Sequence, residues 1–405
     1  MPRQLYIIPN RPAASIWVDE CNVRVNICLV AHYAYRALTN ESAGHIGGVE
    51  RQIALMARWL AGRGHDVSVV VWDEGQATET MVDGVRILPV CRRSAGIPGL
   101  RFFTPRWTSL VRALRTADAE LYYHNCAEYV TGQVALWARR NQRKFVYSIA
   151  SDPECDPRLE ILGSLRERVL FRKGLRIADA VVCQTSSQHR QLGSGFGISS
   201  VVLPMPCDAP ASAVDSRPAG PARTVLWVGR IDRVKRAELL LEAARECAGV
   251  HFRVVGPDGD DAGYVESIRS AARALPNVTL HGAVNFAEVW RHYREADALV
   301  CTSRFEGFPN TFLEAWSQGL PVVSTVDPDG LLAKERLGAV IASASDCGRV
   351  LSDFLADDEM RRRCSENAYR YFKVHHQKDA AMRRFEELFE NVIRDIGPQN
   401  RDNTG

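Results

Sequence analysis

The feature that most constrains this chain is an alternation of short apolar segments with segments of helical period, and this alternation occurs twice. In the first series, the apolar segments lie at 24–30, 67–72, 85–90, 120–123, 144–149, 180–184 and 201–203. Such near-continuous apolar runs are typical of strands that are buried on both faces of a parallel sheet. Helix-period segments separate them at about 48–62, 108–117, 128–141, 158–177 and 186–194. This order predicts an α/β domain with a doubly wound sheet.

A Pro- and Ala-rich segment, residues 204–223, interrupts the pattern and is typical of a linker. The alternation then restarts, with apolar segments at 224–228, 251–255, 278–281, 298–301, 321–324 and 339–341 and helix-period segments at about 236–247, 262–274, 286–295, 310–318 and 346–355. We therefore predict a tail over 1–22, a Rossmann-like domain over 23–203, a linker over 204–223 and a second Rossmann-like domain over 224–375. A helical pattern continues to about residue 395, and we expect residues 376–397 to form a helix that returns to the first domain. Ligands of such sheets bind beyond the carboxyl ends of the strands, so the loops there are the candidate site.

Charge and cysteine content exclude several classes of protein. The 405 residues hold 51 Lys and Arg against 48 Asp and Glu, and this near balance argues against bulk nucleic-acid binding. Residues 1–206 hold 25 basic and 18 acidic residues, a net charge of +7, which is compatible with an anionic partner. None of the 11 cysteines forms a Cys-x-x-Cys pair, so we expect buried free thiols in a reducing compartment and no zinc site. No run of 18 apolar residues is present, and we expect a cytoplasmic protein.

The segment VGRIDRVK, residues 228–235, places two cations at the end of a strand. Gly229 allows a tight turn, and Arg230 and Lys235 then lie in the loop before the next helix. A planar guanidinium and a mobile ammonium together suit a diphosphate. The alternative is a pair of ordinary surface cations in a loop between a strand and a helix.

The segment EGFPNTFLE, residues 306–314, follows another strand of the second series. Its glycine permits close approach of the backbone, and the proline suits the first turn of a helix. Free backbone N–H groups near Asn310 would then face an anion. A carboxylate such as Glu314 can accept hydrogen bonds from vicinal hydroxyls, as an acidic residue does with ribose. The alternative is a capped helix with an ordinary buried glutamate.

Taken together, a Gly-Gly pair before a helix, VGRIDRVK, and EGFPNTFLEAWSQGLPVVST resemble glycosyltransferase family 4, the retaining nucleotide-sugar transferases of the GT-B fold. The resemblance extends from about residue 25 to 393, and its signature is Glu-x7-Glu with Gly-Phe after the first glutamate. Residues 122–152 are similar to a bacterial branch that makes polysaccharides. The resemblance implies two Rossmann-like domains that face a cleft, with the C-terminal helix crossing back to the first domain.

The resemblance also implies a role for each matching residue. Arg230 and Lys235 would bind the donor diphosphate and stabilise its leaving charge, Glu306 would contact the hydroxyls of the donor sugar, and Glu314 would bind the ribose. The remaining donor-binding positions would be Gly47 and Gly48 of the first domain and Gly229, Val284, Gly307, Phe308 and Asn310 of the second.

One position departs from the family. Many members have a histidine at the end of the strand that matches 144–149, near the reacting sugar, whereas this chain continues with Ala150, Ser151 and Asp152. Asp152 is a candidate substitute or a turn residue before a proline. His124 ends the preceding strand, and we expect it to face the same cleft as an acceptor-side or structural residue.

The resemblance implies no metal or other cofactor, because the Arg/Lys pair neutralises the diphosphate. An Asp-x-Asp pair, Asp258 and Asp260, precedes a helix, where turn and N-cap roles explain it. The expected partners are a nucleotide-sugar donor and a glycan or lipid-linked glycan acceptor, with no nucleic acid. Residues 158–177 form a basic amphipathic pattern, which is either a solvated helix face or a peripheral contact with anionic lipid at the inner face of the membrane.

Three other functions remain as alternatives. A nucleotide-sugar epimerase shares the two-domain architecture but needs acid and base carboxylates at the sugar. A dinucleotide oxidoreductase needs G-x-G-x-x-G after a strand, which neither half contains. A non-catalytic protein that binds nucleotide sugars would not need both the cation pair and the glutamates. Release of free nucleoside diphosphate from a panel of nucleotide sugars discriminates among them.

Overall fold

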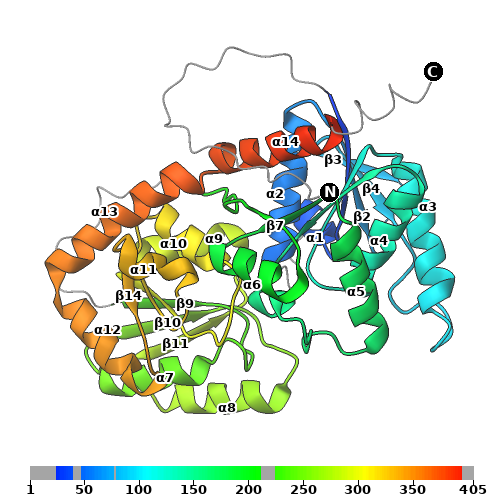
Figure 1. The fold of residues 1–405 in the computed structure, drawn as a ribbon. Coiled ribbons are helices and arrows are strands. Elements are labelled where there is room, and N and C mark those ends of the chain that lie inside the picture. Colours follow the sequence, from blue (N-terminus) through cyan, green and yellow to red (C-terminus); the bar gives the residue numbers. More distant parts are fainter. Residues whose placement is uncertain (1–23, 40–46, 77–78, 211–223, 395–405) are drawn as a thin grey trace, which may run out of the picture.

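The computed structural model describes residues 24–39, 47–76, 79–210 and 224–394, and it contains two α/β domains, each built around its own sheet (Figure 1). The predicted tail over 1–22 and most of the predicted linker, residues 211–223, lie outside the described residues. The chain has the two α/β domains that the alternation predicted, in the arrangement of the GT-B fold that the resemblance implied.

The first sheet has the strand order β3-β4-β2-β1-β5-β6-β7-β8. All of its neighbouring strands are parallel except β3, which runs antiparallel to β4. The strands are β1 (Asn26–Val30), β2 (Asp66–Val71), β3 (Thr80–Val82), β4 (Val85–Pro89), β5 (Leu121–Asn125), β6 (Lys144–Ser148), β7 (Ala180–Cys183) and β8 (Val201–Val202). Sequence reasoning missed β3, because its three residues are at least partly exposed and carry no apolar run.

Helices connect these strands largely as the helical period predicted, but the pattern missed a five-residue helix at 35–39 and placed the start of one helix too early. They are α1 (Tyr35–Thr39), α2 (Gly48–Gly62), α3 (Thr108–Ala117), α4 (Tyr129–Arg140), α5 (Leu165–Ile177) and α6 (Ser186–Phe196), with a π-helical turn η1 (Phe102–Trp107) before α3 and a 3-10 turn η2 (Asp152–Cys155) after β6. The helix expected from residue 158 begins only at Leu165. Leu159 has a left-handed φ of 52°, and Ser164 forms a capping box with Glu167, which fixes the start of α5.

The second sheet has the order β11-β10-β9-β12-β13-β14, and all of its strands are parallel. The strands are β9 (Thr224–Val228), β10 (His251–Val255), β11 (Val278–Gly282), β12 (Ala298–Cys301), β13 (Val322–Ser324) and β14 (Gly338–Val340). The helices are α7 (Ala237–Glu246), α8 (Ala262–Arg273), α9 (Phe286–Glu295), α10 (Asn310–Ser317), α11 (Leu331–Lys334) and α12 (Cys347–Ala356).

The C-terminal helical pattern is divided into two helices, α13 (Asp358–His375) and α14 (Lys378–Arg394), and α14 lies within the range 376–397 predicted for the returning helix. The break occurs because His376 is buried and turns toward the linker: its Nδ1 lies 2.9 Å from the Met205 carbonyl, and its own carbonyl accepts the Cys207 N–H at 2.9 Å. Beyond the break, α14 crosses back to the first domain beside α2 (Figure 1). There the Glu386 carboxylate lies 2.9 Å from His65 Nε2.

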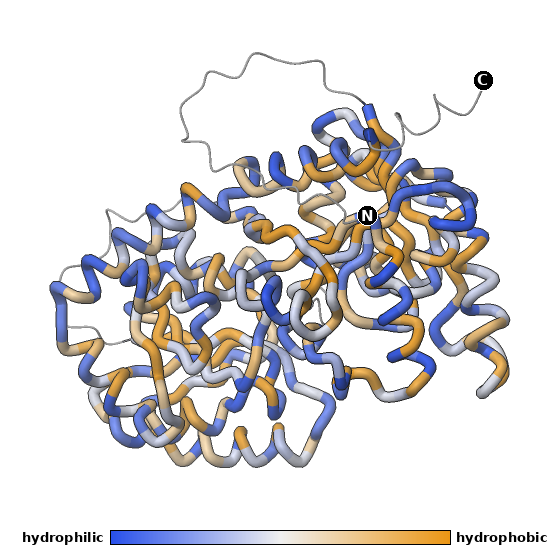
Figure 2. Tube along the Cα trace, viewed as in Figure 1, coloured by the Kyte–Doolittle hydropathy of each residue, from blue (hydrophilic) through white to orange (hydrophobic). Residues whose placement is uncertain are grey.

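Hydrophobic residues concentrate in the strands of both sheets (Figure 2). One buried cluster is continuous from β1 of the first domain to α10 of the second and includes Phe385 and Phe389 of α14. The returning helix therefore joins the two domains through the core as well as through polar contacts.

Candidate active site

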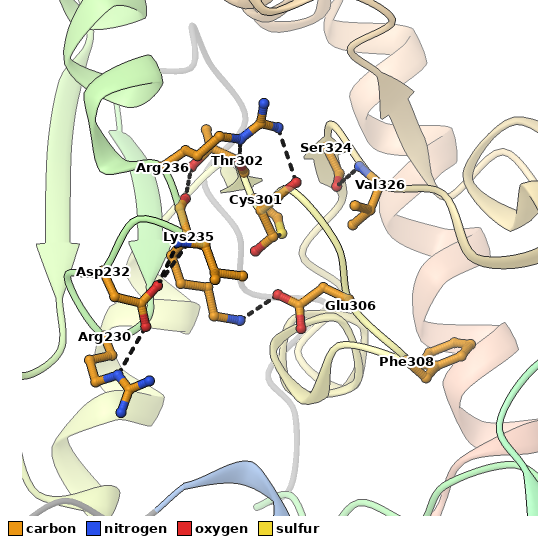
Figure 3. Close-up of polar contacts among 12 residues, drawn as sticks. Arg230, Asp232, Lys235, Arg236, Cys301, Thr302, Glu306, Phe308, Ser324 and Val326 are labelled. Atoms are coloured by element: carbon orange, nitrogen blue, oxygen red, sulfur yellow. Dashed lines mark hydrogen bonds and ion pairs between the residues drawn. The ribbon is translucent and has the colours of Figure 1, made fainter. Parts of the chain in front are cut away.

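Arg230 and Lys235, the two candidate diphosphate-binding cations of the β9–α7 loop, each have a carboxylate partner (Figure 3). Lys235 forms an ion pair with Glu306, and both side chains are mostly buried. Arg230 is more exposed and donates from Nε to Asp232 at 2.9 Å. Burial favours a lower pKa for Lys235, but the charge of Glu306 outweighs it, so the pKa is raised and the amine stays protonated.

Backbone contacts fix the conformation of this loop. The Asp232 carboxylate accepts the N–H groups of Val234 at 3.0 Å and Lys235 at 2.9 Å. The Thr302 hydroxyl donates to the Lys235 carbonyl at 2.6 Å. Arg236, at a left-handed φ of 50°, donates to the Thr302 carbonyl at 2.8 Å (Figure 3). The ammonium of Lys235 is therefore held on a fixed backbone, which is the preorganisation that charge stabilisation needs.

The segment that begins at Glu306 touches the first domain. Phe308 donates its backbone N–H to Gln184 Oε1 at 2.6 Å, and Gln184 directly follows β7. The Glu306 carbonyl accepts the N–H of Asp152 at 3.3 Å. A side chain at Gly307 would bring its Cβ within 2.4 Å of the Ala150 carbonyl oxygen. Gly307 is therefore needed where the two domains meet, and not only for approach to a donor.

Glu314 is buried inside α10, where two groups address its carboxylate. The Tyr293 hydroxyl donates to Oε2 at 2.6 Å, and Arg51 Nη1 of the first domain lies 3.6 Å from Oε1. Burial raises the pKa of Glu314, while the charge of Arg51 and the Tyr293 hydrogen bond act in the opposite direction. A buried carboxylate with these partners is an oriented acceptor for hydroxyl groups.

The glycine pair before α2 lies against the same segment. A Cβ at Gly48 would come within 2.3 Å of Asn310 Nδ2, and a Cβ at Gly47 would come equally close to Glu50 Oε2. Gln52 of α2 donates to Asn310 Oδ1 at 2.8 Å. The structure thus places Gly48 of the first domain next to Asn310 at the N-terminus of α10.

The two remaining candidate donor-side positions, Gly229 and Val284, follow strands β9 and β11, which are separated by β10. Gly229 follows β9 and donates its N–H to the Val255 carbonyl at 3.0 Å. A Cβ on Gly256 would lie only 1.9 Å from the Gly229 carbonyl oxygen, and Gly256 has a φ of 144°, so a side chain is excluded at Gly256. Val284 lies half-buried in the loop between β11 and α9. These loops share one edge of the second sheet with Lys235 and Glu306.

Asp152 begins η2, and its carboxyl group lies close enough to Glu306 for the charge of Glu306 to affect its pKa. Gln188 donates from Nε2 to Asp152 Oδ1 at 2.9 Å. Burial raises the pKa of Asp152 to about 6, and the charges of Glu306 and Asp329 act in the same direction. The residue thus titrates near neutral pH at the junction of the two domains.

His124 belongs to β5 and is only 3% exposed, so its ring lies inside the first domain. Its Nδ1 is 2.7 Å from the Val30 carbonyl, and burial lowers its pKa to about 4. A neutral ring with Nδ1 bonded to the backbone is a structural element of the sheet edge.

The Asp-x-Asp pair, Asp258 and Asp260, lies in the loop between β10 and α8. Arg269 donates to Asp258 at 2.7 Å. The next acidic residue, Asp261, caps α8 by accepting the Tyr264 N–H at 3.0 Å. Among the described residues, no group of three metal-ligating side chains is present.

Sequence reasoning missed three first-domain partners of the site. Arg51 and Gln52 lie three and four positions after Gly48, and their proximity to the glycine pair was the available signal. Gln184 lies at the carboxyl end of a strand, where the rule that selected the other loops would also have selected it. None could be matched with Glu314, Asn310 or Phe308 without knowing how the domains meet.

Models of two glycosyltransferase families match the chain. "Glycosyl transferase 4-like domain" covers residues 47–207, and "Glycosyl transferases group 1" covers residues 222–356. D-inositol 3-phosphate glycosyltransferase from Kineococcus radiotolerans is 28% identical over 71% of this chain and 74% of its own length. Lipopolysaccharide core biosynthesis glycosyltransferase LpsE from Rhizobium meliloti is 26% identical over 51% of this chain and 62% of its own length.

Solved structures share the fold at low sequence identity. Sucrose-phosphate synthase from Thermosynechococcus elongatus superimposes with a TM-score of 0.74 at 20% identity, over 92% of this chain and all of that one. HepE from Anabaena, in complex with UDP and glucose, gives a TM-score of 0.71 at 15% identity, over 91% of this chain and all of that one. Within the described ranges, no helix combines the length and apolar character required to span a bilayer. The two α/β domains and the match of a glycosyltransferase family model to each of them show that this chain belongs to the group 1, family-4-like glycosyltransferases, which transfer a sugar from a nucleotide-sugar donor.

Proposed function

We propose that the chain transfers a hexosyl group from a nucleoside diphosphate sugar to a hydroxyl of a glycan or lipid-linked glycan, with retention of anomeric configuration and without a metal ion. The observation that supports this most strongly is the Lys235–Glu306 ion pair beside Arg230. Lys235 of the β9–α7 loop provides positive charge for the diphosphate, and Glu306 of the β12–α10 loop provides a carboxylate for the sugar. The names of two relatives refer to D-inositol 3-phosphate and to lipopolysaccharide core biosynthesis, and both names support a hydroxyl acceptor.

In this mechanism the bond between the anomeric carbon and the diphosphate breaks, and the acceptor oxygen bonds to the same face of that carbon. The departing diphosphate takes the acceptor proton, so no separate protein base is required. Lys235 and Arg230 stabilise the charge that develops on the leaving group, and such preorganised charges are commonly the largest protein contribution. Glu306 orients the sugar, and Glu314 orients the ribose, which does not react.

The test is incubation of the purified chain with a panel of nucleotide sugars, with and without hydroxyl acceptors, while free nucleoside diphosphate is measured. Transfer predicts that an acceptor stimulates the release of nucleoside diphosphate. Retention predicts that the product, examined by proton NMR, has the same anomeric configuration as the donor. An inverted product would refute retention. Binding of nucleotide sugar with no release would favour a non-catalytic binding protein.

We also propose that α5 makes a peripheral contact with anionic lipid. Leu165 and Val169 are exposed by 74% and 54%, and exposed Lys173 continues the same helix face one turn further on. Exposed apolar side chains beside basic ones are typical of a helix that lies in a membrane interface. Co-sedimentation with vesicles containing phosphatidylglycerol should decrease in 0.5 M salt and in the Leu165→Glu variant. Equal sedimentation with neutral and anionic vesicles would refute the contact.

A further inference from the structure

A cavity of about 1060 Å³ lies at the carboxyl edge of the first sheet, apart from the residues assigned to the donor. The segments that follow β1, β2, β4 and β5 line it, and η1 with the residue before it closes one side. These are the ends of the strands at which α/β sheets bind ligands.

Four arginines and four acidic residues line the cavity, but the acids have other partners. The Glu74 carboxylate accepts from Arg36 Nε at 2.8 Å, and the Glu167 carboxylate takes part in the capping box of α5. Asp73 accepts the Gly75 N–H at 2.8 Å and pairs with Arg92 at 3.6 Å. The cavity therefore has less available negative charge than its composition suggests.

The fourth acid, Glu128, is the N-cap residue of α4. Burial raises its pKa to about 7, and the charges of Glu50 and Glu167 act in the same direction, while that of Arg93 opposes them. Glu128 is thus only partly ionised at neutral pH.

The other three arginines, Arg93, Arg101 and Arg106, form no ion pair with a carboxylate of any described residue. Arg106 donates to the Arg93 carbonyl at 2.8 Å, and its guanidinium lies 5.7 Å from the centre of the Trp72 ring. The Arg93 guanidinium lies 5.5 Å from the centre of the Tyr33 ring. Stacking on aromatic rings holds two of these cations in place without neutralising them.

Two buried donors of the wall have no hydrogen-bond partner within the described part of the chain. They are Nε of Arg106 and Nε1 of Trp72, whose side chain is 6% exposed. Buried polar groups are nearly always paired in native proteins, so these atoms suit a ligand with several acceptor oxygens. The Trp72 and Tyr33 rings provide apolar surface beside them, which suits a sugar or cyclitol ring.

Electrostatic interactions connect Glu50 with one residue of the donor side and with one residue of the cavity. Burial raises the pKa of Glu50, and the charge of Arg230 is among the influences that lower it. Glu50 in turn acts on Glu128 of the cavity. Glu50 therefore lies within electrostatic reach of both sites.

We propose that this cavity is the acceptor subsite, and that Arg93, Arg101 and Arg106 bind a phosphate group carried by the acceptor. The inference rests on the proposed function and adds the chemical class of the acceptor. A phosphate monoester or diester presents several acceptor oxygens, and planar guanidinium groups match its geometry well. A single carboxylate has only two acceptor oxygens and would leave some of the N–H donors of the three guanidinium groups without a partner. The phosphate can belong to a soluble sugar or polyol phosphate or to a polyprenyl-linked sugar.

The test is calorimetry of the full chain in saturating nucleoside diphosphate, which occupies the diphosphate-binding cations of the second domain. The soluble probes are D-inositol 3-phosphate, glucose 6-phosphate, their unphosphorylated counterparts and glucuronate. A polyprenyl diphosphate sugar in detergent micelles is the lipid-linked probe. The proposal is supported if a phosphorylated probe binds while its unphosphorylated counterpart and glucuronate do not bind. Binding only of the soluble or only of the micellar probe identifies the source of the phosphate.

The variants Arg93→Gln and Arg101→Gln should each weaken phosphate-probe binding by on the order of 10- to 100-fold, the usual loss for a hydrogen bond to a charged group. Arg115→Gln is the matched control, because Arg115 is an exposed arginine of α3 that does not line the cavity. Arg106→Lys keeps the charge and should lose less than Arg106→Gln. Unchanged affinity in both Arg93→Gln and Arg101→Gln would overturn the proposal, as would equal binding of neutral probes.

Nucleoside diphosphate release in the absence of acceptor separates the two proposals. It should be the same in the wild type and in the Arg115→Gln control, because Arg115 does not line the cavity. If the wild type releases nothing from any nucleotide sugar while phosphate probes still bind in the cavity, the proposed function fails and the cavity stands as an anion site alone. If release occurs and no phosphate probe binds, the acceptor class is wrong.

Discussion

Replacement of Gly307 by alanine tests whether the junction between the domains sets the geometry of transfer. The added Cβ would lie 2.4 Å from the Ala150 carbonyl oxygen and 2.5 Å from Gln184 Oε1, whereas ordinary contact begins near 3.4 Å. The shortfall is 1.0 Å at Ala150, where backbone has to move. At Gln184, relief of the contact would break the 2.6 Å bond from the Phe308 N–H.

The magnitude follows from these distances. A displacement of about 1 Å between reacting groups costs on the order of 10²-fold in rate, and the lost hydrogen bond costs about 1 kcal/mol. We therefore expect kcat of Gly307→Ala to fall about 100-fold. Affinity for free nucleoside diphosphate should stay near the wild-type value, because Arg230, Lys235 and Glu314 do not move with the first domain.

The assay is initial-rate kinetics at saturating donor, with calorimetry of nucleoside diphosphate on the same preparation. Gly193→Ala is the control, since a Cβ there meets no atom within 4 Å. Thermal unfolding confirms that both variants are folded. A Gly307→Ala enzyme with wild-type kcat would show that the junction does not position the reacting groups.

Four further predictions address the donor site. Lys235→Ala should lower kcat by on the order of 10²–10³, as removal of one charge-stabilising group typically does, and an unchanged initial rate would refute the assignment. Glu314→Gln should weaken nucleoside diphosphate binding in calorimetry, whereas Glu306→Gln should retain binding and lose turnover; the reverse pattern would reverse the donor orientation. Asp152 is the candidate substitute for the family's histidine near the reacting sugar, and we expect its carboxylate to orient that sugar and not to act as a base. Its pKa is raised to about 6, so the carboxylate becomes protonated as the pH falls through that value, and the wild-type rate should fall on the acid side of pH 6. The Asp152→Asn variant should lack this limb of the pH–rate profile, and an unchanged profile would exclude the residue. Excess chelator should leave the wild-type rate unchanged, and rescue by manganese after inhibition would refute the metal-free mechanism.

Much of the fold could be predicted because buried parallel strands have an apolar signature. The strands that became β9, β10 and β12 were predicted to the residue, since each is a short, mostly buried run at the centre of a sheet. The edge strand β3 was missed because exposure removes that signature. The early part of the 158–177 pattern is not helical, because Leu159 adopts a left-handed conformation and Ser164 caps the helix.

The candidate site likewise has a part that the sequence predicted and a part that it did not. Local spacing placed the cations and glutamates at strand ends, because carboxyl ends of parallel strands share one edge. The partners of those residues come from the other domain, and sequence distance does not encode such contacts. Arg51 and Glu314 are separated by 263 positions, yet the ion-pair distance between them is 3.6 Å.

The segment from Glu306 to Glu314 links donor recognition to the position of the first domain. Its beginning contacts Ala150 and Asp152, its middle contacts Gln52 through Asn310, and its end reaches Arg51. A donor held by the two glutamates therefore meets groups of both domains at once. An acceptor bound at the edge of the first sheet is then positioned relative to the anomeric carbon by the same contacts. Substitutions at this junction should consequently change transfer to acceptor more than they change binding of free nucleotide.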